Sequence, residues 1–140
     1  MSKTTLGFVF AGMAYLVIGV TLGILFYVEP DMLKLRSVHV HLNLVGFVTF
    51  LIFGIGYHIL PRFRGRPLRS ERLAWFQFWM ANAGLLGLSL VNTLIAYEVL
   101  KDVSYLQVTF GAVLVLSVYL FIYNMSRTLL SPAPVPPARK

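Results

Sequence analysis

Long apolar stretches separated by short polar segments dominate the pattern of this chain. Four of them have about twenty residues or more, the length that an α-helix needs to cross roughly 30 Å of hydrocarbon. They cover residues 5–28, 38–60, 73–97 and 103–125. Because the connecting segments are short, neighbouring helices should run antiparallel. The pattern therefore predicts an all-α fold, an integral membrane up-down bundle of four helices.

The pattern also predicts one domain and one tail. The first apolar stretch runs from Thr5 to Val28 without a charge, which is longer than the apolar region of a signal peptide, so we expect a retained membrane span. We expect a four-helix domain over residues 1–130. The tail, residues 131–140, is rich in proline and should be disordered.

Composition supports a membrane protein rather than a soluble one. Hydrophobic residues make up 58% of the chain and charged residues 12%, whereas a soluble domain has roughly twice that charge. The formal net charge is +7, but the basic residues lie at the predicted helix ends. We therefore expect the lipid bilayer, and no nucleic acid, as a partner. The chain has no cysteine, which excludes disulfides and thiolate metal sites.

The basic residues are distributed unequally between the two ends of the predicted bundle. One end carries nine of them and one acid, and the other carries three basic residues and four acids. An excess of Lys and Arg marks the cytoplasmic side of a membrane protein. We expect a multi-pass protein of the cell inner (plasma) membrane with cytoplasmic N- and C-termini. The nine residues are Lys3, Arg62, Arg64, Arg66, Arg69, Arg72, Arg127, Arg139 and Lys140.

Small and amide residues within the spans are candidates for helix contacts. Glycines at positions 19 and 23 of the first span would allow another helix to approach closely. Amide side chains in apolar spans usually link helices by hydrogen bonds. We expect this role for Asn43, Asn82, Asn92 and Asn124.

All three histidines lie on the second predicted helix. An ionisable residue within a membrane span is a candidate functional residue, and imidazole binds heme iron and copper well. His58 comes 17 residues after His41, which is about 25 Å along a helix axis. One metal therefore cannot bind His39, His41 and His58 together.

Spacing also separates His39 from His41. Residues two apart on a helix point about 200° apart, so these two cannot be axial ligands of one iron. A bis-histidine heme would need the same helix of a second protomer; otherwise a methionine or an open position completes the iron. This predicts a homodimer or homotrimer. Spacing alone leaves open that the imidazoles only bond lipid headgroups or backbone carbonyls.

The segment from His39 to Arg62 resembles a heme-bearing helix of the catalytic subunit of heme–copper oxidases, HVHLNLVGFVTFLIFGIGYHILPR. The likeness is to the C-type (cbb-type) oxidases and the related nitric oxide reductases. In that large subunit, twelve helices form three pseudo-repeats of four, with metal-ligating histidines on the second helix of each. This chain is similar to one such repeat. The resemblance implies His39 and His41 as heme-ligand positions, the first for a high-spin and the second for a low-spin heme.

The resemblance also implies cofactors and neighbouring residues. The cofactor would be heme b, with copper as a further candidate. Arg36 and Lys34 lie just outside His39, where they would contact heme propionates, although lipid headgroups are alternative partners. His58 has two interpretations, a structural or interfacial role at a helix end, or a second metal or heme site.

Two functions follow from the sequence. The first is a heme-b-binding membrane protein related to heme–copper oxidase subunit I, acting in electron transfer or in binding O₂ or NO, with a respiratory-chain electron donor as partner. The second is a non-catalytic structural, assembly or metal-delivery subunit of a respiratory oxidase. We find no counterpart of the paired copper-ligand histidines and no acid deep within a span for proton uptake. Complete oxidase activity is therefore not expected, and whether the chain is an enzyme stays open.

Overall fold

The computed structural model describes residues 1–131 of the 140-residue chain. Within that range all regular structure is helical and no strand occurs, which confirms the all-α prediction. The predicted disordered tail lies outside the described residues except for Ser131. In chain order the elements are α1 (Lys3–Val28), the 3₁₀ helix η1 (Pro30–Leu35), α2 (Arg36–His41), the π-helix η2 (Leu42–Thr49), α3 (Phe50–Phe63), α4 (Glu71–Ala96) and α5 (Ser104–Leu130).

Four helical stretches are long and apolar enough to cross a membrane. They are Lys3–Val28, Pro30–Phe63, Glu71–Ala96 and Ser104–Leu130. Large apolar side chains cover their outer faces, and Phe10, Ile24 and Val108 are 65%, 65% and 70% exposed. Such a surface suits hydrocarbon and not water. The chain is a multi-pass membrane protein.

The second stretch is longer at both ends than the predicted span 38–60. The connection before it is helical because Pro30 occupies the first turn of η1, where the fixed φ of proline suits a helix start. At the other end, Pro61 lies inside α3, which continues to Phe63. The connection between the first two spans is therefore itself helical, in η1.

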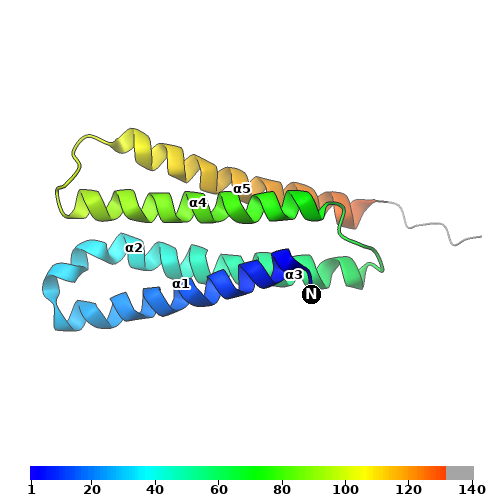
Figure 1. Ribbon diagram of the computed structural model, residues 1–140, viewed down its shortest axis with the longest axis horizontal. Helices are drawn as coiled ribbons and strands as arrows, with labels where there is room; N and C mark the ends of the chain where they lie inside the picture. The colour runs from blue at the N-terminus through cyan, green and yellow to red at the C-terminus, as the bar shows by residue number, and fades with distance from the viewer. Residues whose placement is uncertain (132–140) are drawn as a thin grey trace, which may run out of the picture.

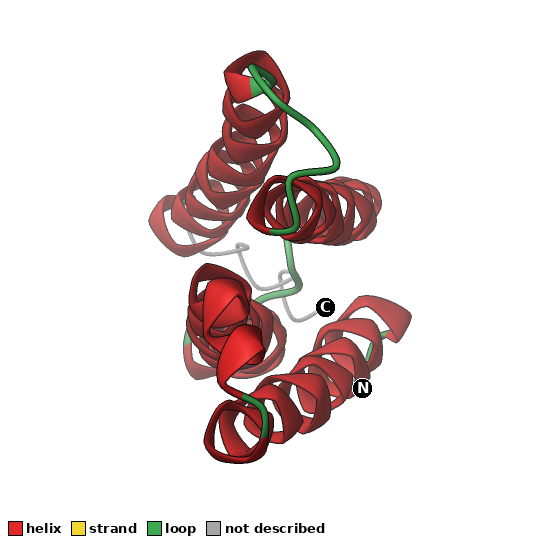
Figure 2. Ribbon diagram, turned by 90° about the vertical axis from the view of Figure 1, so that its left-hand side faces the viewer, coloured by secondary structure: helices red, strands yellow, loops and turns green. Residues whose placement is uncertain are grey.

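The helices form two antiparallel hairpins that lie side by side (Figure 1). One hairpin pairs α1 with α2, η2 and α3, and the other pairs α4 with α5. Seen end-on, each hairpin forms one layer of the bundle (Figure 2). The N-terminus, the α3–α4 connection and the end of α5 lie at one end (Figure 1). That end carries residues 61–72, which comprise the end of α3, the connection and the start of α4 and contain five arginines. We call this segment the arginine loop and this end of the bundle the arginine end.

Aromatic rings join the two hairpins in the core. Phe8 of α1 is fully buried and meets the rings of Phe50, Phe53 and Phe78 edge-on, at centroid distances of 5.2, 5.6 and 5.0 Å. Phe121 of α5 packs on Phe53 at 4.5 Å. Edge-on pairs of this kind add stability beyond the area that they bury. This cluster links α1, α3, α4 and α5.

Three of the four amides expected to link helices make such bonds, which confirms that part of the prediction. The pairs are Tyr15 Oη donating to Asn82 Oδ1 (2.6 Å), Gln107 Nε2 to Asn92 Oδ1 (2.7 Å), and Asn124 Nδ2 to the carbonyl of Ser70, the N-cap of α4 (2.9 Å). Asn43 differs, because its amide donates to the carbonyl of His39 one turn earlier on its own helical stretch, at 2.8 Å.

Candidate functional site

His39 lies at the interface between α2 and α1. Its Nδ1 is 2.8 Å from the carbonyl oxygen of Gly19 on α1. Gly23, one turn further along α1, leaves room for the ring, since a Cβ there would lie 3.0 Å from His39 Cε1. The ring of Phe26 meets the imidazole at a centroid distance of 5.2 Å. Gly19 and Gly23 of α1 therefore form part of the surface on which His39 packs.

The Gly19 contact fixes the tautomer of His39. A carbonyl oxygen can only accept, so the proton must be on Nδ1. The amide nitrogen of Asn43 is also near Nδ1, but at 3.4 Å, and it makes its shorter bond to the His39 carbonyl. We therefore assign the Nδ1–H form. Nε2 then keeps the lone pair, which is the form in which histidine binds a metal.

His41 has the same arrangement in different surroundings. Its Nδ1 is 2.8 Å from the carbonyl oxygen of Ser37, one turn earlier on α2, so its Nδ1 also carries the proton and its Nε2 the lone pair. The ring is half-buried. The His39 ring is thus hydrogen-bonded to α1, whereas the His41 ring is hydrogen-bonded to its own helix. These contacts agree with the helical spacing of the two residues, which directs the rings to different sides.

A π-helix begins directly after the two histidines. Within η2, the Thr49 hydroxyl donates to the Leu44 carbonyl five residues earlier, at 2.9 Å. Gly46 lets this wider helix approach α1, because a Cβ there would lie 2.7 Å from the Cβ of Tyr15. π-helical turns within α-helices occur frequently at functional sites. The sequence does not reveal η2, since no residue pattern distinguishes a π-helical turn from an α-helical one.

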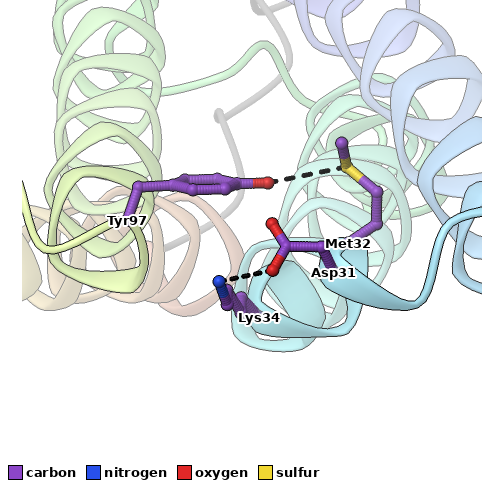
Figure 3. A network of polar contacts seen from close by, with 4 residues as sticks. All are labelled: Asp31, Met32, Lys34 and Tyr97. Atoms are coloured by element: carbon purple, nitrogen blue, oxygen red, sulfur yellow. Dashed lines mark hydrogen bonds and ion pairs between the residues drawn. The ribbon is translucent and has the colours of Figure 1, made fainter.

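Lys34 belongs to a polar network at the end opposite the arginine end (Figure 3). Its Nζ pairs with the carboxylate of Asp31 and lies 5.5 Å from the ring centroid of Tyr97, the C-cap of α4. The Tyr97 hydroxyl donates to Met32 Sδ at 3.7 Å (Figure 3). The network connects the ends of the two hairpins, and Asp31 compensates the charge of Lys34.

Arg36 is the first residue of α2, three residues before His39. Its side chain is exposed. Among residues 1–131 the structure gives one ion pair, that of Lys34 with Asp31, so Arg36 is not held by a carboxylate there. Of the two residues expected to contact propionates, Lys34 already pairs with Asp31, and only Arg36 has a charge free to bind another carboxylate.

His58 lies far along the same stretch, near the end of α3. Arg62 Nη1 is within hydrogen-bond distance of both ring nitrogens and lies 2.6 Å from Nδ1. Because a guanidinium only donates, the ring accepts. His58 lines a polar cavity of about 240 Å³ at the arginine end. The structure does not bring it together with His39 or His41.

Comparison with known proteins identifies the family. The family model for Cytochrome C and Quinol oxidase polypeptide I matches residues 3–138. The chain belongs to this family. Membership confirms the predicted relation to subunit I of the heme–copper oxidases. No curated protein and no solved structure gave a significant match.

Proteins of the oxidase polypeptide I family bind heme and copper. In the part of this chain that the structure describes, no three His, Asp or Glu side chains come together as a metal-binding group. One chain therefore offers single imidazole ligands that are separate from one another. This donor set fits heme, since His39 or His41 could each supply the single imidazole that a heme iron takes from one helix.

Proposed function

We propose that this member of the oxidase polypeptide I family binds heme b and acts in electron transfer or in binding O₂ or NO. The observation that carries the proposal is the common arrangement of His39 and His41. In each, Nδ1–H donates to a backbone carbonyl at 2.8 Å and Nε2 keeps the lone pair. Histidine ligands of metals are usually held by such a bond, which fixes the ring and raises the basicity of the ligating nitrogen.

The surroundings of the two rings support an assembly of more than one chain. His39 is held between two helices, while His41 is bonded to its own helix and remains partly open. Since their contacts differ in direction, the two imidazoles suit different iron atoms. We propose a homodimer or homotrimer in which the second ligand of an iron comes from another chain. Copper remains a further candidate, with ligands from more than one chain.

Bound heme b supplies reversible one-electron chemistry at iron, and an open coordination position would bind O₂ or NO. The chain would contribute the ligand, its orientation and a charge for the propionates. Arg36 suits that charge better than Lys34, because Arg36 is exposed and Lys34 pairs with Asp31. A guanidinium also binds a carboxylate through two parallel hydrogen bonds.

Charge supports the orientation in the membrane. Among residues 1–131, the arginine end carries seven basic residues and the end with His39 and His41 carries three. By the positive-inside rule, the arginine end and both termini would be cytoplasmic in the inner (plasma) membrane. The histidine pair would then lie near the outer face, where an electron donor of the respiratory chain could approach it.

The test is the absorption spectrum of the full chain, purified in detergent after expression with heme supplied. We expect a Soret band and b-type bands in the reduced-minus-oxidised difference spectrum. A CO-induced change would show an open iron position, and no CO response would show two protein ligands. A chain without a Soret band would contradict the proposal and favour a structural, assembly or metal-delivery subunit.

A further inference from the structure

The chain reverses direction after α3 through a turn centred on Gly65. Its φ of +64° lies in the left-handed region that favours glycine. The Gly65 N–H donates to the Arg62 carbonyl at 2.9 Å, and the Arg66 N–H donates to the Pro61 carbonyl at 3.0 Å. These two bonds define a Schellman motif. The turn directs the chain at Arg66 back toward the bundle.

Arg66 is unusual among the arginines of this loop. Its Nε and Nη1 are buried and have no hydrogen-bond partner within residues 1–131. The exposed Arg64, in contrast, donates to the Leu129 carbonyl at 3.3 Å, and the Arg69 side chain is exposed. A buried cationic donor without an acceptor is unfavourable. The position of Arg66 therefore calls for an acceptor that residues 1–131 do not supply.

A polar cavity of about 240 Å³ lies beside Arg66. Its walls come from the start of α1, the end of α3 and the start of α4, and they include the hydroxyls of Ser2 and Thr5. Its charged lining residues are two arginines, Arg62 and Arg66, and one acid, Glu71. His58, which also lines the cavity, accepts from Arg62 and adds no charge as a neutral ring. The cavity is thus positive overall and suits an anion.

A groove of about 450 Å³ adjoins this cavity and shares Ser2 and Glu71 with it. Its exposed atoms are mostly apolar, although Trp75 is its one apolar lining residue, and we call it the apolar groove. It continues past Lys3 and Arg72 to Trp75. Tryptophan and basic residues at a helix end mark the headgroup level of a bilayer. A positive cavity next to an apolar groove at that level matches an amphiphile with a negatively charged head.

We propose that the arginine end binds an anionic phospholipid, with its phosphate on Arg66 and an acyl chain in the groove beside Trp75. Inorganic phosphate shares the headgroup chemistry, but the adjoining groove selects the lipid. The site is separate from the histidine pair, which lies at the other end of the second helical stretch. The proposal therefore does not depend on heme binding.

Native mass spectrometry of delipidated full-length protein tests the site. With added phosphatidylglycerol, we expect one retained lipid per chain. Arg66→Gln should weaken retention by roughly tenfold or more, since it removes charge-assisted hydrogen bonds of a buried group. The matched control Arg69→Gln makes the same charge change on an exposed side chain of the same loop. It should alter retention by at most about twofold.

A second variant keeps the test valid if Arg66→Gln fails to fold. Glu71→Gln preserves an oxygen that can accept from the Thr4 hydroxyl, as the carboxylate does at 3.4 Å, and removes the negative charge. It should increase phosphatidylglycerol retention, which only a folded protein can show.

Three outcomes would overturn the proposal. Equal losses in Arg66→Gln and Arg69→Gln would show diffuse attraction of headgroups to the loop. If Arg66→Gln retained as much lipid as the wild type, Arg66 would not contact the phosphate. If thermal shift gave inorganic phosphate the same affinity as phosphatidylglycerol, the groove would bind no acyl chain.

Discussion

At the scale of single residues, His39 and His41 share one hydrogen-bond arrangement but have different neighbours. Spacing along the helix predicted that the two rings diverge, because that depends only on helix geometry. The contact of His39 with Gly19 could not be predicted, because it depends on how α1 is rotated against α2. The same holds for the cavity at Arg66, which exists because the Gly65 turn folds back onto the bundle.

The packing of His39 on α1 leads to a prediction for Gly23. In Gly23→Val the Cβ would lie 3.0 Å from His39 Cε1, and its methyl groups would need further room. The imidazole should be displaced, and we expect the heme content of the purified protein to fall severalfold. Gly111→Val is the matched control, because a Cβ at Gly111 meets no atom within 4 Å. Equal heme content in both variants would show that the α1 surface does not position His39.

At the scale of elements, hydropathy predicted the helices better than their internal geometry. The four apolar runs fix where helices form because the bilayer requires satisfied backbone groups. The division of the second stretch into η1, α2, η2 and α3 has no such signal, because the residues themselves do not distinguish 3₁₀, α and π turns within one apolar run. Proline usually marks a connection, yet Pro30 lies in the first turn of η1 and Pro61 lies in the last turn of α3.

The contact between α4 and α5 depends on Gly84. A Cβ there would lie 2.7 Å from the backbone nitrogen of Leu114, which cannot move aside as a side chain can. Gly84→Ala should therefore lower the free energy of unfolding by about 1–3 kcal/mol. Gly111→Ala has open space and should be neutral or stabilising by up to ~1 kcal/mol. Unfolding in mixed detergent micelles followed by circular dichroism measures both, and equal stabilities would contradict this packing.

At the scale of the whole molecule, the family match covers residues 3–138, so the relation to oxidase subunit I belongs to the four-helix unit as a whole. Short connections predicted antiparallel neighbours correctly. They did not predict that the bundle divides into two hairpins, with α1 on the second stretch and α4 on α5. That division depends on which helix faces are complementary, such as Gly46 with Tyr15 and Gly84 with Leu114.

The charge asymmetry predicts one orientation in the membrane. Green fluorescent protein fused to the C-terminus should fluoresce, and alkaline phosphatase at the same place should be inactive, because the arginine end is expected in the cytoplasm. The same two reporters inserted after Lys101, in the α4–α5 connection, should give the opposite result. An active phosphatase at the C-terminus would reverse the proposed orientation.

The central claim is that the second helical stretch holds heme through His39 and His41. The most direct measurement is the heme-to-protein ratio and Soret spectrum of three variants, His39→Ala, His41→Ala and His58→Ala, each purified beside the wild type. Removing an imidazole ligand should shift the Soret band and lower heme retention by at least about tenfold. His58→Ala, the same change at the arginine end, should match the wild type. An unchanged spectrum in His41→Ala, or an equal loss in all three variants, would contradict the account.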